Sequence, residues 1–431
     1  MRHRNMNDHR PTGDPVPSFL RSLHFYELLG KQWLATIYVA GVSMLLSFFL
    51  GRFLGPEGYG RYSYALTVAA LLAVFQDGGF KTLIFRETVT GYPVAAKSFD
   101  GLMSSALLYT LFSTCFLLVV LFLIPEKSRK ILQVAVICFG FQTVAGFIGA
   151  RLKGSGRFGR DALWQVGVRT LSAVMIAVWI IWVSPDATGV FTAWLVGGGL
   201  ALLIFREGRN LPRPQYSNQL KFLIKNALAF VVVDAATIVY FRVDIVLLRW
   251  LTGNDVMIGQ YAAAYRILEG VTLIAAPFSQ LCFRQLRMLR QQSGAFLRLA
   301  DHLIFVMGTA ALLLVLGSIL AGRWVITFCF GGAYLEAALL LPWIMGALFF
   351  ILPNAILTQA AIALDLEYAY AGAAIGAALV NVGLNVWLIP RYEALGAAWA
   401  TIITEAFLTM ALIGGIRFYR FNKDGTHAPS R

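Results

Sequence analysis

The stretch "YFRVDIVLLRW" (240–250) continues an apolar run that begins near Leu223, yet it carries Arg242, Asp244 and Arg249. The run is long enough for a membrane-spanning helix, which needs about 20 mostly apolar residues. A charge at mid-membrane costs roughly 2.5–3.5 kcal/mol on insertion scales, so it needs a partner or a water-filled cavity. We therefore expect the fold to bring one or the other to this helix.

The rest of the chain is equally apolar. Its 431 residues are 58% hydrophobic and 13% charged, with a mean hydropathy of +0.69, whereas soluble domains are roughly 45–50% apolar and about 25% charged. This composition predicts an all-helical integral membrane protein. The net charge of +14 would indicate nucleic acid only on a soluble domain, and none is predicted. The four cysteines lie in apolar stretches without CxxC spacing and read as small hydrophobic residues.

Twelve windows are predicted to span the membrane: 33–54, 60–84, 101–124, 131–150, 162–183, 187–205, 222–248, 257–283, 303–321, 337–363, 369–389 and 395–416. With both termini in the cytoplasm, 25 of the 36 Lys and Arg residues lie in inner segments, eight in outer segments and three within spans. Basic residues favour the cytoplasmic side, so this bias predicts that orientation. The bounds of the tenth span stay open, because Pro342 and Pro353 interrupt it and the preceding "WVITFCF" is also apolar.

An internal repeat divides the chain into halves. "LGPEGYGRYSYA" (54–65) and "LTGNDVMIGQYAAA" (251–264) both end a helix at a glycine turn and restart with G-x-Y-x-x-A. This predicts a parallel duplication with a substrate site between the halves; a common loop-to-helix restart is the alternative. The predicted parts are a cytoplasmic leader at 1–30, an N-lobe at 31–205, a cytoplasmic loop at 206–221, a C-lobe at 222–416 and a cytoplasmic tail at 417–431.

The charges of the seventh span suggest a cationic cavity. Arg242 and Asp244 are two residues apart on a helix, so they point to nearly opposite sides and cannot neutralise each other. Arg242 is interpreted as lining the cavity, with an interhelical ion pair to Asp77 or Glu269 as the alternative. A structural bond is equally acceptable for Asp244, and for Arg249 we favour snorkelling to the outer surface.

The second and eighth spans add further candidates. Arg266 and Glu269 are three residues apart and can pair on one face; alternatively Arg266 faces the substrate and Glu269 tunes it or binds a coupling cation. Asp77 precedes a Gly-Gly break, where unwound backbone can serve a cavity or a hinge, and Lys81 follows it. Asp234 is a further buried carboxylate for proton or sodium coupling.

Catalysis has little support in the sequence. No HExxH, DxD or GxSxG motif occurs, no loop exceeds about 20 residues, and the five histidines lie in the tails or at one helix edge. The chain is therefore interpreted as a transporter and not as an enzyme. Arg169 in the fifth span and Glu405 in the twelfth receive no role.

Four stretches resemble a known family: "RFLGPEGYGRYSYALTVAALLAVFQDGGF" (52–80), "GSGRFGRDALWQ" (154–165), "VDIVLLRWLTGNDVMIGQYAAAYRI" (243–267) and "YEALGAAWATIITE" (392–405). They are similar to the polysaccharide/oligosaccharide flippases of the multidrug/oligosaccharidyl-lipid/polysaccharide (MOP) exporter superfamily. The resemblance implies two pseudo-symmetric six-helix lobes around a central cationic cavity, which alternate in access. The positions it carries over are the cavity residues Asp77, Lys81, Arg242, Asp244, Arg266 and Glu269, and the hinge or gate residues Arg52, Gly55, Gly60, Gly253 and Gly259.

The function that the resemblance implies is the flipping of undecaprenyl-diphosphate-linked oligosaccharide across a bacterial inner membrane, for O-antigen, capsule or exopolysaccharide assembly. Its partners would be that lipid-linked substrate, membrane lipid and polysaccharide polymerase or assembly proteins, with no nucleic acid and no cofactor. Coupling to a proton or sodium gradient, or to the membrane potential, stays open, as does the identity of the glycan. The alternatives are a cation-coupled drug antiporter and a non-transporting scaffold of a polysaccharide assembly complex.

Overall fold

A computed structural model of the chain describes residues 23–90, 99–123, 126–214 and 220–425. Within these ranges the structure is helical and contains no strand, as the composition predicts. Its helices are α1 (Leu23–Asp77), α2 (Phe80–Thr90), α3 (Phe99–Val120), η2 (Leu121–Leu123), α4 (Glu126–Gly154), α5 (Phe158–Trp182), α6 (Ala187–Ile204), α7 (Arg206–Arg209), α8 (Leu220–Thr252), α9 (Asp255–Met288), α10 (Ser293–Phe330), η3 (Gly332–Tyr334), α11 (Leu335–Gly346), α12 (Leu348–Ala363) and α13 (Glu367–Gly425).

Two of these helices, α1 and α13, run across the turn between two predicted spans. In α1 the helix turns at Gly55, whose φ of 65° favours glycine, and Pro56 follows without an N–H to donate. In α13 the break is at Glu393, with a φ of 53°, three residues after Pro390. The first two predicted spans are therefore two helices joined at the Gly55 turn, and the last two are joined at the Glu393 turn. The second predicted span, 60–84, is divided once more at Gly78 and Gly79, between α1 and α2.

The tenth predicted span is broken. The helix α11 ends at Gly346, and α12 begins at Leu348. The apolar "WVITFCF" segment belongs to the end of α10. The two prolines do not mark the break, because Pro342 lies inside α11 and Pro353 inside α12.

The surface of the helices is apolar. Phe112, Leu320 and Leu379 are each at least 70% exposed, which in water would be an aggregation hazard and in a bilayer is contact with lipid. In the described part of the chain, eight helical stretches are long and apolar enough to cross a membrane. Glu367–Tyr419 holds the last two predicted spans, and Gly30–Asp77 holds the first and most of the second. The chain is thus a multi-pass membrane protein.

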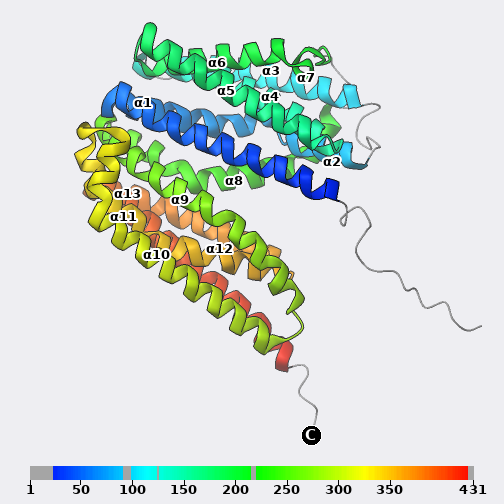
Figure 1. Ribbon diagram of the computed structural model, residues 1–431, viewed down its shortest axis with the longest axis vertical. Helices are drawn as coiled ribbons and strands as arrows, with labels where there is room; N and C mark the ends of the chain where they lie inside the picture. The colour runs from blue at the N-terminus through cyan, green and yellow to red at the C-terminus, as the bar shows by residue number, and fades with distance from the viewer. Residues whose placement is uncertain (1–22, 91–98, 124–125, 215–219, 426–431) are drawn as a thin grey trace, which may run out of the picture.

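The helices form two bundles (Figure 1). One contains α1 to α7 and the other α8 to α13, with α1 lying beside α8 and α9. The bundles converge at the end where α1 turns and diverge toward the end where α1 begins and α13 ends. At the convergent end a buried apolar cluster combines both bundles, including Tyr59 and Tyr62 of α1 and Tyr261 of α9. The other buried clusters each belong to one bundle, so apolar packing joins the lobes mainly at this end.

Candidate functional site

Two arginines share one carboxylate where the bundles meet. Arg242 Nη2 of α8 lies 3.0 Å from Glu269 Oε1 of α9, and Arg266 Nη1 lies 2.5 Å from Glu269 Oε2. Their side chains remain 31%, 22% and 23% exposed for Arg242, Arg266 and Glu269 respectively. The group therefore carries a net positive charge and is accessible, as required of a site that receives an anion. We call these three residues the interlobe triad.

The interlobe triad is bonded to the other lobe. Arg266 Nε donates to Ser47 Oγ of α1 at 2.9 Å, and Ser47 Oγ lies 2.6 Å from the Tyr59 hydroxyl. Ser47 and Tyr59 are both buried. A guanidinium on the C-lobe thus depends on a polar pair in the N-lobe, and this bond must break if the lobes separate here.

Asp244 takes no part in the interlobe triad. It is buried, and it accepts hydrogen bonds from the Tyr261 hydroxyl at 2.5 Å and from the Ile245 N–H at 2.8 Å. The structural-bond interpretation is therefore the one that the structure favours. Asp244 and Glu405 both line a small space of about 20 Å³ inside the C-lobe.

Glu405 has partners from two other helices. The Tyr240 hydroxyl of α8 donates to it at 2.5 Å, and Asn354 Nδ2 of α12 donates at 2.8 Å. Sequence reasoning left this carboxylate unassigned, because its partners come from distant segments.

Asp77 caps a helix. Its carboxylate accepts from the backbone N–H groups of Gly79 and Lys81, each at 3.2 Å. Gly78 and Gly79 both have positive φ, so the predicted Gly-Gly break is present and α2 begins after it. The side chain of Lys81 was predicted beside Arg242 and Arg266, but it lines a cavity inside the N-lobe. The Asp234 side chain lies outside the described residues.

That N-lobe cavity, of about 270 Å³, was not predicted. Besides Lys81 it is lined by Gln142 of α4 and by Asp161, Arg169 and Ser172 of α5. Four buried atoms on its wall have no hydrogen-bond partner among the described protein atoms: Gln142 Nε2, Asp161 Oδ1, Arg169 Nε and Ser172 Oγ. Buried polar groups are normally satisfied by protein or water, so the cavity is suited to water or a polar ligand. The one feature of the sequence that pointed to this cavity was Arg169, an arginine within the fifth predicted span.

The two repeats pack against each other through their backbones. A Cβ on Gly60 would overlap the carbonyl oxygen of Asp255, and a Cβ on Gly259 would overlap that of Pro56. Gly55 and Gly253, the turn glycines of the two repeats, each have a φ of 65° and open space around them. The G-x-Y-x-x-A motif is therefore the contact that allows backbones of both lobes to approach at the convergent end.

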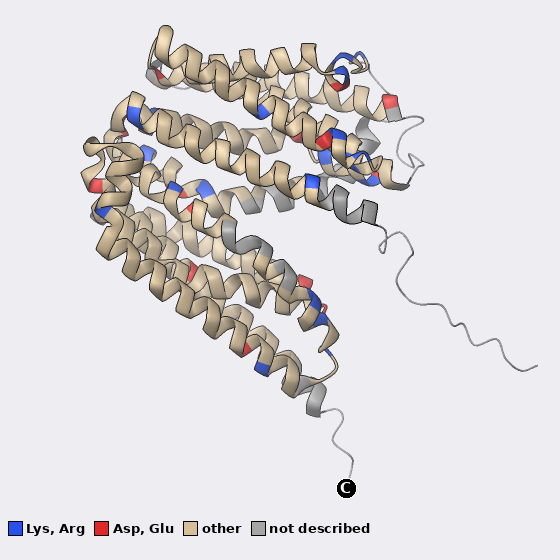
Figure 2. Cartoon of the chain, in the orientation of Figure 1, with Lys and Arg blue, Asp and Glu red and all other residues tan. Residues whose placement is uncertain are grey.

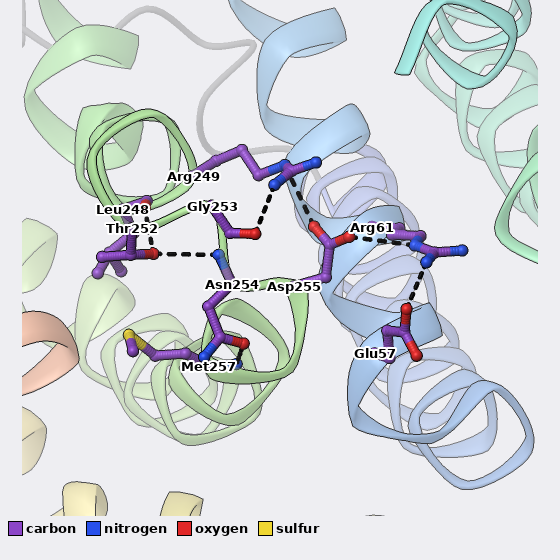
Figure 3. A network of polar contacts seen from close by, with 9 residues as sticks. All are labelled: Glu57, Arg61, Leu248, Arg249, Thr252, Gly253, Asn254, Asp255 and Met257. Carbon is purple, nitrogen blue, oxygen red and sulfur yellow. Dashed lines mark hydrogen bonds and ion pairs between the residues drawn. The ribbon is translucent and has the colours of Figure 1, made fainter. Parts of the chain in front are cut away.

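Charged residues reinforce this contact (Figure 3). Arg249 Nε forms an ion pair with Asp255 Oδ1 at 3.2 Å, and Asp255 Oδ2 accepts a hydrogen bond from Arg61 Nε at 3.1 Å. Arg61 also pairs with Glu57. Arg249 is thus paired within the C-lobe, where snorkelling was expected, and the pair of Asp255 with Arg61 joins the two lobes.

Arg52, at the other side of the α1 turn, donates to the carbonyl oxygens of Phe328 and Cys329 on α10. Of the predicted hinge or gate residues, Arg52, Gly60 and Gly259 all join one lobe to the other.

Comparison with known proteins agrees with this architecture. Residues 31–283, more than half of the chain, match the family model described as "Polysaccharide biosynthesis protein". Among curated protein sequences, none matches.

Solved structures share the fold. The lipid II flippase MurJ in an inward closed conformation superposes with a TM-score of 0.69 at 15% identity, covering 90% of this chain and 87% of that one. An inward-facing multidrug resistance MATE family transporter of the MOP superfamily gives 0.63 at 14% identity, covering 90% and 96%. A MOP superfamily transporter from Pyrococcus furiosus, described by the reverse polarity of its binding pocket, gives 0.58 at 14% identity, covering 92% and 95%. At these identities the likeness shows the fold alone.

Proposed function

The chain belongs to the polysaccharide biosynthesis protein family, and we propose that it flips a polyprenyl-diphosphate-linked oligosaccharide across the bacterial inner membrane. The flipped oligosaccharide would supply O-antigen, capsule or exopolysaccharide assembly. Both chain termini would lie in the cytoplasm. The membrane-spanning MOP fold and the family support transport, and the interlobe triad supports an anionic head group.

The observation that carries the proposal is the sharing of Glu269 by Arg242 and Arg266. A carboxylate keeps two guanidinium groups in place, but it neutralises only one charge. A diphosphate can replace Glu269 as their partner, because guanidinium groups form bidentate bonds with phosphate oxygens. Binding would thereby release Glu269 and weaken the geometry that positions Arg266 against Ser47, which couples the substrate to lobe movement.

The cycle requires the two ends of the bundle to open in turn. The convergent end is closed by the Gly60–Gly259 contact and by the Arg61–Asp255–Arg249 ion pairs. Substrate would enter at the divergent end, where the basic residues predict the cytoplasm, with its polyprenyl tail in lipid. Glu269 and Asp234 are the carboxylates proposed for coupling to protons or sodium; the membrane potential is the alternative driving force.

The test is loss of surface polysaccharide. Arg242→Ala and Arg266→Ala are expressed in a knockout of this gene, with protein quantity checked by immunoblot, beside the control Arg298→Ala. Arg298 is exposed and bonds only a carbonyl of its own helix among the described contacts. We expect both triad variants to lose polymer and accumulate lipid-linked oligosaccharide on the inner leaflet. Full polymer in both would refute the charge-binding mechanism.

Drug extrusion is the second candidate, favoured by the shared fold with a multidrug resistance transporter. It predicts that deletion raises sensitivity to cationic drugs while surface glycans remain intact. The excess of arginine in the interlobe triad argues against a cationic substrate.

A further inference from the structure

A cationic cavity, different from the N-lobe cavity described above, lies at one end of the N-lobe. It has a volume of about 570 Å³, within the range of small-molecule sites. The described residues of its lining come from α2, α3, α4, the α4–α5 connection and the segment around α7, and none of them lies beyond Leu211. Figure 2 shows Lys and Arg residues gathered at this end of the N-lobe. The cavity is therefore separate from the interlobe triad.

Four arginines line this cavity, and three of them, Arg157, Arg160 and Arg206, are exposed. Arg151, Arg157, Arg160 and Arg206 line it, together with a single carboxylate, Glu207. Arg151 also pairs with Asp100 at 3.2 Å. Among the residues that the structure describes, the other three arginines have no ion pair. Even with both carboxylates counted, the cavity wall keeps a positive charge.

Close packing fixes the backbone segments that carry these arginines. The α4–α5 turn is fixed by the bond from the Arg157 N–H to the Leu152 carbonyl at 2.9 Å. Gly154 faces Thr88 of α2 so closely that a Cβ would overlap it. The segment after α7 is tied to α3 by the bond from Ser104 Oγ to the Arg213 carbonyl at 2.5 Å.

The positive-inside bias explains why basic residues occur at this end, but it does not explain why four of them line one hollow. Arg206 and Arg209 are both exposed on the same short helix, but of the two only Arg206 lines the cavity. Guanidinium groups match phosphate oxygens in geometry and charge. Basic pockets between helices at the cytoplasmic surface are suited to anionic head groups.

We propose that this cavity binds a phosphate-bearing anion through Arg157, Arg160 and Arg206. The shared chemistry is a phosphate or diphosphate group, carried either by an anionic membrane lipid or by a soluble molecule of the cytoplasm. The site is distinct from the interlobe triad, because no described residue belongs to both.

Binding is tested on the full-length protein in nanodiscs. One arm measures pyrophosphate binding to protein in phosphatidylcholine nanodiscs by isothermal titration calorimetry. The other arm counts phosphatidylglycerol molecules retained on the protein by native mass spectrometry. The variants are Arg157→Gln combined with Arg206→Gln, and Arg160→Gln alone; Arg209→Gln is the matched control. Thermal unfolding without ligand confirms that each variant is folded, and the single variant keeps the test valid if the double variant is not.

We expect at least one probe to bind the wild type and to bind the cavity variants about tenfold more weakly, with Arg209→Gln unchanged. Binding of pyrophosphate alone would identify a soluble ligand, and retention of phosphatidylglycerol alone a lipid. Failure of both probes to bind the wild type, or an equal loss in Arg209→Gln, would overturn the proposal.

Discussion

Arg242 and Arg266, from adjacent helices, are held by opposite oxygens of the same carboxylate, Glu269. Each guanidinium is therefore kept in place by a group that the other also uses. This arrangement explains how an apolar helix can carry an arginine in the membrane. Arg242 is paired with a carboxylate and remains accessible, and the two arginines together carry one more charge than Glu269 neutralises. It also makes Glu269 the residue on which both arginines depend.

Glu269→Gln should destabilise the protein and impair transport. The amide leaves two partly buried guanidinium groups without a counter-charge, at a cost of about 1–3 kcal/mol in the free energy of unfolding. We expect a lower melting temperature in detergent and less surface polysaccharide. Glu336→Gln, at an exposed position in α11, is the control. Unchanged melting and polymer would mean that the shared carboxylate has no structural role.

Gly60→Ala should open the convergent end of the lobes. Its Cβ would overlap the Asp255 carbonyl, and backbone cannot move aside as a side chain can. A cysteine at Ser47, which is buried at the lobe interface, should then react faster with an impermeant maleimide added outside. The measurement uses a background without the four native cysteines. Gly414→Ala, which meets nothing within 4 Å, should leave the rate unchanged, and equal rates in all three proteins would exclude this contact as a gate.

Arg169→Leu should separate stability from transport. Its guanidinium is buried on the wall of the N-lobe cavity, where Nε has no partner among the described atoms. Arg169 has no ion pair among the described residues, so an apolar side chain removes the desolvation cost of an unpaired buried charge. We expect an unchanged or higher melting temperature together with reduced surface polysaccharide. A melting temperature that falls by several degrees would show that Arg169 is structural.

The ion pairs of Asp365 should stabilise the folded protein slightly, and this contribution should be lost in acid. The hydrogen bond from Arg287, together with the charges of Arg287 and Arg290, lowers the pKa of this carboxyl. A lowered folded-state pKa contributes stability above the unfolded pKa of about 3.9, and this contribution is lost as the pH falls through the folded value.

Asp365→Asn should therefore melt at a lower temperature than the wild type at pH 6, and the difference should shrink below about pH 4. Asparagine tolerates the positive φ at this position, so the backbone is preserved. A difference that is independent of pH would show that the ion pairs contribute nothing.

Most of the helical layout was predictable, because each span is a long apolar run and the breaks carry Gly or Pro. The Gly78–Gly79 break and the pairing of Arg266 with Glu269 follow from local spacing alone. Other features depend on contacts between distant segments. The Asp244–Tyr261 bond and the N-lobe cavity join different helices, and no local pattern specifies which residues face one another. The repeat singled out Gly60 and Gly259, but only the structure shows that they meet.

The most direct measurement is translocation in proteoliposomes. Purified protein is reconstituted with a fluorescent polyprenyl-diphosphate oligosaccharide, and the label that becomes accessible on the opposite leaflet is followed with time. We expect the Arg242→Ala/Arg266→Ala double variant to translocate at least about tenfold more slowly than wild type, because each charge-assisted bond is worth about 1.5–3 kcal/mol. Arg298→Ala should match wild type. A double variant that flips the lipid at the wild-type rate would contradict the assignment of the interlobe triad as the head-group site.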